Sequence, residues 1–532
     1  MAWCSQLATT TLSGSEIFES KPGKTQRVPK RGAATVPISR RELLQAVGRG
    51  AATALAAGAT AAVARAAAAR AGAAPDWARL RSRLAGTLIL PGEAGYEAAR
   101  RSFNPLFDGR RPAAVARCAG PEDVQRCVAA AAAWGLPIAA RGGGHSYAGY
   151  STPEHGLVVD MSAMAGVEVR PDGTAAVGAG ARLIDVYAAL ARAGRCLPAG
   201  SCPTVGIAGL TLGGGVGVLA RKLGLTCDRL TAARVVTADA LMRTASAAAE
   251  PDLFWALRGG GGGNLGIVTT FLFATAPAPD LTVFSLRFPA GAVAGVLGGW
   301  QAWAPAVPDE LWSSCIVSAG EPPACRVGGC FAGSAAALAP LLDELVRRAG
   351  ARPLGRATRE LGYLDAMRYF GGCSRRTVAE CRLRGDGSGQ LAREAFAASS
   401  RIMARPVADP GRVASLLHRP PGVDALFDAL GGAVGRVAAG ATAFPHRAAI
   451  ATVQIYASAE GGHARRAAQE VAEVAGGLGN LLGSGAYVNY IDPDLPGWAN
   501  AYYGPNLGRL RQVARRYDPR GVFAFPQGIS RA

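Results

Sequence analysis

Lysine is nearly absent from this chain of 532 residues. It occurs only at positions 21, 24, 30 and 222, although the chain has 57 basic residues. Arginines therefore carry most of the net charge of +19, and no dense basic run follows residue 66. This pattern is typical of general surface charge and argues against a nucleic-acid-binding face. Charged residues make up 18% and apolar residues 49%, which excludes a disordered protein.

The chain also lacks an N-terminal apolar run long enough to cross a bilayer. Residues 50–64 are apolar or small but number only 15, too few to span a hydrocarbon core of ~30 Å. They follow Ser39-Arg40-Arg41, and together the two features resemble a twin-arginine export signal. We therefore expect residues 1–74 to be an N-terminal extension, export by the twin-arginine machinery and no stable membrane insertion. An alanine-rich extension without a targeting role is the alternative.

Metal-ligand spacing is missing as well. No second Cys or His pair stands at zinc-binding distance from Cys325 and Cys330, so we expect no metal site. An exported protein can oxidise some of its 11 cysteines. The pairs Cys325/Cys330 and Cys373/Cys381 are close enough in sequence to be candidates, but spacing alone does not give the connectivity.

Two patterns of apolar residues divide the rest of the chain. From about 110 to 275, short apolar runs alternate with alanine-rich helical segments, and after Pro277-Ala278-Pro279 the strands become longer and more alternating. The second pattern predicts an antiparallel sheet backed by helices. The expected helices are 121–134, 183–193 and 335–349, and the expected strands are 138–140, 156–160, 234–238, 267–273, 281–288 and 448–456.

Three glycine clusters, at 142–144, 213–217 and 259–263, could aim backbone N–H groups at a phosphate. Each cluster alone is a weak signal. A dinucleotide fingerprint placed on 213–217 lacks the strand just before it and the acidic residue ~20 positions later. The sequence therefore argues against a Rossmann nicotinamide site.

Two segments are more specific when they are taken together. The first is Arg141-Gly142-Gly143-Gly144-His145-Ser146-Tyr147, and the second is Gly-Ser-Cys-Pro-Thr-Val-Gly-Ile-Ala-Gly over residues 200–209. They resemble the berberine-bridge-enzyme-like FAD-linked oxidases, flavoproteins of the vanillyl-alcohol-oxidase type. The resemblance continues through residues 253–269, 444–447, 487–492 and 503–519 and is faint from 280 to 440.

This resemblance implies an α+β fold in which a PCMH-type FAD-binding domain of two α+β subdomains covers residues 95–276. Residues 277–480 would form the substrate-binding domain, and residues 481–532 would complete the FAD domain. The family's bicovalent attachment of FAD would fall on His145 and Cys202. The other implied cofactor-binding residues are Arg141, Gly142, Gly143, Gly144, Ser146, Val205, Gly206, Ile207, Ala208, Gly209, Leu210, Val216, Ile267, Val268, Tyr487 and Asn489.

The two attachment residues also have structural interpretations. His145 could cap a helix after a glycine turn, and Cys202 could be an inert core thiol or half of a disulfide. The presence of both residues inside their family motifs favours attachment to the flavin. Two tethers would hold the cofactor without a deep enclosing pocket, which would leave the cavity open to bulky substrates.

Oxidation of an alcohol requires a base for the hydroxyl proton, and the resemblance gives Tyr490 that role. A phenol with the ordinary pKa of ~10 is a poor base near neutrality, so positive charge or hydrogen bonds must lower its pKa. The sequence does not identify the group responsible. In the alternative interpretation Tyr490 only packs on the flavin ring or positions the substrate.

The predicted function is that of a secreted FAD-dependent oxidase that takes hydride from an alcohol or amine carbon and reduces oxygen to hydrogen peroxide. Val205 favours an oxidase because the resemblance associates a small residue there with oxygen access. An oligosaccharide or a glycosylated or polycyclic secondary metabolite would fit as substrate. The alternatives are a flavin dehydrogenase with another electron acceptor and, more remotely, a cofactor-free basic binding protein on the same fold.

Overall fold

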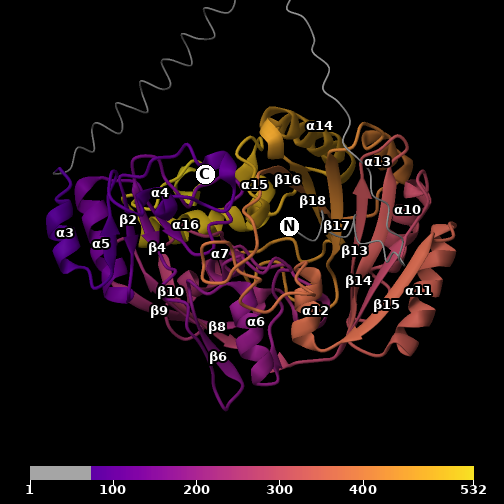
Figure 1. Ribbon diagram of the computed structural model, residues 1–532, viewed down its shortest axis with the longest axis horizontal. Coiled ribbons are helices and arrows are strands. Elements are labelled where there is room, and N and C mark those ends of the chain that lie inside the picture. The colour runs from indigo at the N-terminus through magenta and orange to yellow at the C-terminus, as the bar shows by residue number, and fades with distance from the viewer. Residues whose placement is uncertain (1–73) are drawn as a thin grey trace, which may run out of the picture.

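The computed structural model describes residues 74–532. The predicted N-terminal extension and its arginine pair lie outside the described residues, apart from residue 74. The described chain forms two lobes, one built on a four-stranded and a five-stranded sheet and the other on a seven-stranded sheet (Figure 1). Helices and sheets are mixed in both lobes, as an α+β fold requires. Within the described range, no helix has both the length and the apolar character needed to cross a membrane.

The four-stranded sheet carries the first glycine cluster at the end of one strand. Its order is β1 (Thr87–Ile89), β2 (Ala114–Arg117), β4 (Leu157–Asp160) and β3 (Ile138–Arg141), with β2, β4 and β3 parallel. Helix α5 (Pro121–Trp134) connects β2 to β3 over the predicted residues. It begins with Pro121, whose missing N–H is tolerated in the first turn, and ends at Gly135 in the left-handed conformation.

The five-stranded sheet is antiparallel and lies beside the second glycine cluster, at residues 213–217. Its order is β5 (Val167–Val169), β6 (Thr174–Gly178), β10 (Ile267–Ala274), β8 (Leu230–Val236) and β9 (Met242–Ser246). The strand predicted at 234–238 begins earlier because Leu230 already pairs with Phe273. It ends at Val236 because Thr237 bonds the carboxylate of Asp239 and forms a turn.

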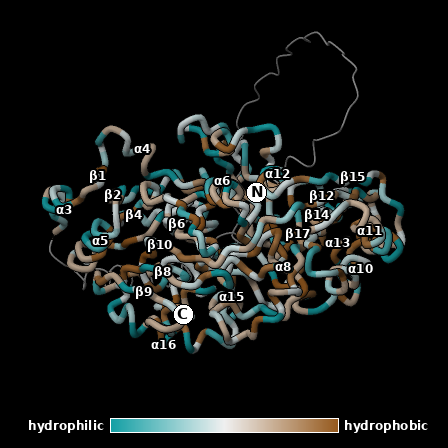
Figure 2. The backbone as a smooth tube through the Cα atoms, turned by 90° about the horizontal axis from the view of Figure 1, so that it is seen from below, coloured by the Kyte–Doolittle hydropathy of each residue, from teal (hydrophilic) through white to brown (hydrophobic). Residues whose placement is uncertain are grey.

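The second lobe is the predicted antiparallel sheet backed by helices. The strand order is β15 (Gly355–Leu361), β12 (Leu281–Arg287), β14 (Ala324–Phe331), β13 (Leu311–Ser318), β17 (Val423–Ala429), β18 (Ala451–Ser458) and β16 (Phe396–Met403). Helices α10 (Val293–Trp303), α11 (Ala335–Ala349), α13 (Pro410–Leu416) and α14 (Ala464–Leu482) lie on the face turned away from the first lobe (Figure 1). The apolar stretches lie mainly inside the molecule (Figure 2).

One predicted cysteine pair is wrong. Cys325 and Cys330 lie five residues apart on strand β14, which separates them by roughly 17 Å and turns them to opposite faces of the sheet. A disulfide requires Cα atoms within about 7 Å. Cys373 and Cys381 instead share a small buried cluster with Ile184, but both are free thiols in the described chain.

The C-terminal segment returns to the first lobe (Figure 1), where it is hydrogen-bonded to Gly215 and Asn264. It contains η4 (Val488–Tyr490), α15 (Trp498–Tyr503) and α16 (Leu507–Tyr517). Near its end, the Ile529 N–H donates to Asn264 Oδ1 at 2.9 Å, and Asn264 Nδ2 donates to the Gly260 carbonyl at 2.9 Å. The third glycine cluster is thereby fixed to the C-terminus.

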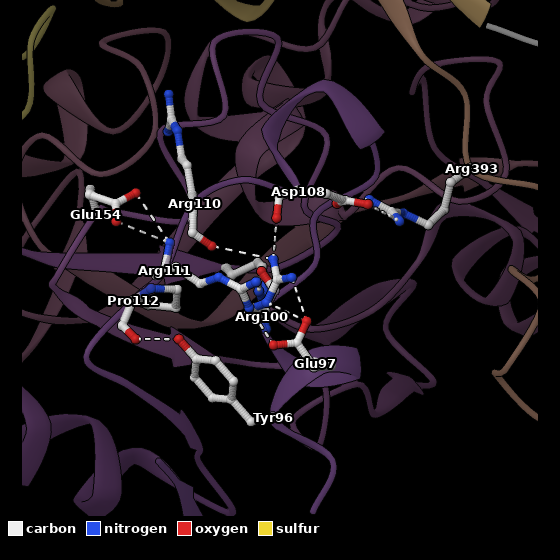
Figure 3. A network of polar contacts seen from close by, with 10 residues as sticks. Tyr96, Glu97, Arg100, Asp108, Arg110, Arg111, Pro112, Glu154 and Arg393 are labelled. Atoms are coloured by element: carbon white, nitrogen blue, oxygen red, sulfur yellow. Dashed lines mark hydrogen bonds and ion pairs between the residues drawn. The ribbon is translucent and has the colours of Figure 1, made fainter. Parts of the chain in front are cut away.

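A polar network fixes the segment that precedes the first site motif (Figure 3). Arg100, buried at the end of α4 (Tyr96–Ala99), bonds Glu97 and the Asp108 carbonyl. Arg393, which precedes strand β16, pairs with the Asp108 carboxylate and so ties the second lobe to this segment. The Arg100 carbonyl in turn accepts from Arg141 Nη1 at 3.2 Å.

Candidate active site

A cavity of about 330 Å³ lies where the three glycine clusters, the C-terminal segment and the seven-stranded sheet meet. This size falls in the range of small-molecule sites. Most of the predicted site residues line it: Gly142, Gly143, Gly144, His145, Ser146, Cys202, Val205, Gly206, Ala208, Gly209, Leu210, Val216, Ile267, Val268, Tyr487, Asn489 and Tyr490.

Two predicted cofactor-binding residues, Arg141 and Ile207, do not line the cavity. Arg141 ends strand β3, and its side chain turns to Asp160 on the adjacent strand, with Nη2 2.7 Å from Oδ2. Burial opposes ionisation of Asp160, but Arg141 and Ser162 together lower the pKa of this carboxyl. Ile207 begins helix α7 (Ile207–Leu212) with its side chain fully buried in the core. Both side chains therefore pack inside the protein and not against the cavity.

The two motifs at residues 141–147 and 200–209 contact each other through their backbones. A Cβ atom on Gly143 would lie 2.2 Å from the Gly206 nitrogen, and one on Gly206 would lie 2.2 Å from the Gly143 nitrogen. Only glycine permits this approach. At Gly209, which lines the cavity, no atom lies within 4 Å of the Cβ position. The motif therefore leaves space where a side chain would otherwise enter the site.

His145 and Cys202 come together although 56 residues separate them in the sequence. The hydroxyl oxygen of Thr204 lies 3.0 Å from His145 Nε2 and 3.4 Å from Cys202 Sγ. The ring of Phe103 stacks on the imidazole, with centroids 3.8 Å apart and planes inclined by 18°. The nitrogen and sulfur nucleophiles therefore face one region of the cavity.

The state of His145 suits attachment to a cofactor. Burial lowers the pKa of this imidazole well below its ordinary value, and the positive charge of Arg182 adds to the effect. The ring is therefore neutral near pH 7. Its Nδ1 atom is buried and has no hydrogen-bond partner among residues 74–532, and a buried polar atom of this kind calls for an explanation. The orphaned nitrogen, the nearby thiol and the glycine-lined space fit a bound FAD.

The C-terminal segment is bonded to the second glycine cluster. The Tyr487 hydroxyl accepts from the N–H groups of Gly215 and Val216 at 2.9 and 3.2 Å and from Asn489 Nδ2 at 2.8 Å. Burial raises the pKa of Tyr487 to about 12, so this phenol is not a base. Asn489 lies so close to Gly213 that a Cβ there would be 2.0 Å from Asn489 Oδ1.

Tyr490 lines the cavity among aromatic rings. Its ring stacks on Tyr147 with centroids 5.4 Å apart and meets Tyr487 edge-on at 5.0 Å. Gln454 Nε2 donates to the Tyr147 hydroxyl at 2.6 Å. Gln454 belongs to strand β18 and lines the cavity, so the seven-stranded sheet contributes directly to the surroundings of Tyr490.

The sequence interpretation did not identify Asp428 as a site residue. Asp428 lies on β17 beside Ser314 of β13 and lines the cavity together with Trp312, Leu426 and Gln454. Burial raises the pKa of this carboxyl to about 7, which allows it to exchange a proton near neutrality. An acidic residue inside a buried strand was a usable signal, because such groups cluster at functional sites.

Two protein families match separate parts of this chain. The family described as FAD binding domain matches residues 112–246, and the family described as Berberine and berberine like matches residues 486–530. The chain is 34% identical over 460 residues to YgaK, an uncharacterised FAD-linked oxidoreductase of Bacillus subtilis (strain 168), with 84% of this chain and 98% of the relative covered. The chain belongs to the berberine-bridge-enzyme-like family of FAD-linked oxidoreductases.

Other members of this family agree over most of their length. The xylooligosaccharide oxidase of Thermothelomyces thermophilus is 31% identical over 450 residues, which cover 79% of this chain and 88% of that enzyme. The structure of berberine-bridge-enzyme-like protein 1 of Physcomitrella patens superposes with a TM-score of 0.78 at 31% identity and covers 85% of this chain and 98% of the other. The predicted family, the fold class and the assignment as an FAD-linked oxidoreductase are confirmed.

Proposed function

We propose that this berberine-bridge-like enzyme holds FAD through bonds to both His145 and Cys202 and oxidises an alcohol carbon of an oligosaccharide. The observation that carries the proposal is the shared position of the two nucleophiles, joined through Thr204 at the wall of the cavity. Bound there, FAD would supply a hydride acceptor and would pass two electrons to oxygen to give hydrogen peroxide. Each bond would form with loss of a proton from the ring system and one from the side chain, and oxygen would take up the electron pair.

Tyr490 accepts the substrate's hydroxyl proton in this proposal. It lines the cavity, and its ring contacts both Tyr147 and Tyr487. Asp428 provides a second group in the same cavity whose pKa is about 7. Its carboxylate form would be available in the cavity to take up a proton near neutrality.

The relatives' activities favour a carbohydrate substrate. One enzyme that matches 79% of this chain is named for the oxidation of xylooligosaccharides. The cavity wall here carries Tyr147, Trp312, Gln454 and Asp428, which combine aromatic faces with hydrogen-bonding groups suited to a sugar. The small side chain of Val205 on the cavity wall supports reaction with oxygen. Export through the twin-arginine machinery remains part of the proposal and places this reaction outside the cell.

Peroxide release on mixing the purified protein with panels of oligosaccharides and aromatic alcohols tests this function. Release with an oligosaccharide supports the proposal. Anaerobic reduction by substrate followed by rapid mixing with oxygen separates the oxidase from a dehydrogenase, because slow reoxidation indicates another acceptor. A colourless preparation that is inert to every compound indicates the cofactor-free binding protein.

A further inference from the structure

Thr204 is the contact shared by the two candidate attachment residues, and its place is tightly fixed. Its side chain is 3% exposed. The loop around it is clamped to the first turn of helix α6 (Leu183–Arg192), where the Leu183 and Ile184 N–H groups donate to the carbonyls of Val205 and Pro203 at 2.9 and 3.0 Å. Arg182 Nη1 donates to the Thr204 carbonyl at 3.3 Å. The backbone that carries the hydroxyl is therefore held in place beside His145.

We propose that Thr204 is a positioning residue that orients both His145 and Cys202 for attachment to the flavin. This inference rests on the proposed function. Before attachment, Nε2–H of the neutral imidazole donates to Thr204 Oγ1, which leaves the lone pair on Nδ1. The threonine proton is then free to point at Cys202 Sγ, 3.4 Å away.

After attachment, the Thr204 hydroxyl would donate a hydrogen bond to Nε2, whereas before attachment it accepts one. If a C–N bond formed at Nδ1, a C–H bond of the ring system would break, that proton and the one on Nε2 would be released, and oxygen would take up the two electrons. Nε2 is then an acceptor, because the buried imidazole stays neutral. A hydroxyl both donates and accepts, so Thr204 satisfies Nε2 in either state without moving. A methyl group in its place satisfies neither state.

The neighbouring contacts leave Nδ1 as the nitrogen that is free to react. Phe103 covers the face of the imidazole, and Nε2 is engaged by Thr204. Nδ1 has no hydrogen-bond partner in the described part of the chain. Loss of the Thr204 hydroxyl would allow the ring to choose the other tautomer or to rotate, and misplacement of a reacting atom by about 1 Å can cost about 10²-fold in rate.

Two substitution pairs isolate the hydroxyl. Thr204→Val keeps the shape of the native residue and removes the hydroxyl, whereas Thr204→Ser keeps the hydroxyl. Thr204→Ala differs from Thr204→Ser by one oxygen atom, and it provides the same comparison if the valine variant does not fold. Thr211→Val is the matched control, because Thr211 is fully buried nearby and donates to the Ile207 carbonyl at 2.8 Å without contacting either nucleophile.

The measurement is proteolytic mapping of flavin-carrying peptides from each purified, acid-denatured protein. Wild type, Thr204→Ser and Thr211→Val should give mainly one cross-linked species that contains both His145 and Cys202. Thr204→Val and Thr204→Ala should give about tenfold less of this species, with singly linked and released FAD in its place. Equal yields of the cross-linked species in all the variants overturn the role of Thr204. Its absence from wild type overturns the proposed bicovalent attachment instead.

Discussion

The ring of Tyr147 stacks on the ring of Tyr490 with centroids 5.4 Å apart and planes inclined by only 14°. Tyr147 follows the first glycine cluster, whereas Tyr490 belongs to the C-terminal segment. The hydroxyl of Tyr147 is bonded to Gln454 on the sheet of the second lobe. Three distant parts of the chain thus fix the position of one phenol, which suits a group that must meet the substrate at a defined place.

Replacement of Tyr490 by phenylalanine should slow flavin reduction by substrate about 10²-fold or more, because the variant retains the stacked ring but has no group to accept the proton. Stopped-flow absorbance under anaerobic conditions measures this rate. The flavin should stay attached. Tyr517→Phe, which alters a phenol bonded to Glu250 outside the cavity, should reduce at the wild-type rate. An unchanged rate in Tyr490→Phe would remove this residue from the role of base.

The pH dependence of flavin reduction should report Asp428. Burial raises the pKa of its carboxyl from 3.8 to about 7, so the carboxylate form increases as the pH rises through about 7. The rate should increase over the same interval in wild type, and Asp428→Asn should remove that inflection. Asp424→Asn, on the same strand but outside the cavity lining, is the control and should keep it. An identical profile in Asp428→Asn would exclude this carboxyl from the reaction.

Asp428 should also make stability depend on pH. The folded protein disfavours the ionised carboxyl of Asp428. The resulting decrease in the free energy of unfolding is absent below about pH 4, grows between pH 4 and 7, and is complete above pH 7. Asp428→Asn should therefore raise the free energy of unfolding by a few kcal/mol at pH 8 relative to its effect at pH 4. Denaturant unfolding at the two pH values measures this difference. A pH-independent difference between the variant and wild type would contradict the shift.

Enlargement of Val205 should separate the two halves of the reaction. Val205→Leu places more side chain in the cavity wall and should slow reoxidation by oxygen about tenfold, equivalent to about 1.4 kcal/mol of added barrier. Anaerobic reduction by substrate should change little. Val205→Ala should reoxidise at least as fast as wild type in the same stopped-flow assay. If both variants react with oxygen at the wild-type rate, this side chain does not control oxygen access.

A buried ion pair joins the two lobes behind the site. Arg447 bonds Asp228 with two contacts of 2.7 Å, and both side chains are almost fully buried. Arg447→Met leaves the carboxylate buried without its partner and should destabilise the protein by about 3–5 kcal/mol. Arg81→Ala removes an exposed pair with Glu93 and should cost less than about 1 kcal/mol. Similar midpoints of denaturant unfolding for the two variants would contradict this ranking.

The family motifs could be predicted to meet in one site because the resemblance to berberine-bridge-enzyme-like flavoproteins covers both of them. Gly143 and Gly206 approach each other so closely that no other residue fits, and this contact brings His145 and Cys202 together. The direction of each side chain within a motif could not be predicted in the same way. Arg141 and Ile207 lie inside the motifs, but one turns to Asp160 and the other to the core.

The contribution of the second lobe depended on strand register, which the sequence does not provide. Asp428 and Gln454 enter the cavity because β17 pairs with β13 on one side and with β18 on the other. A shift of one residue would turn both side chains to the opposite face. The faint resemblance between residues 280 and 440 gave no help there. The disulfide between Cys325 and Cys330 could likewise be excluded only from the structure, which places both residues on one continuous strand, β14.

Intact mass of the acid-denatured polypeptide tests the central claim most directly. Acid precipitation removes a flavin that is held only by noncovalent contacts and retains one bonded to His145 and Cys202. The account predicts a yellow pellet whose mass exceeds that of the polypeptide by one FAD. A colourless pellet with the mass of the polypeptide alone would contradict it.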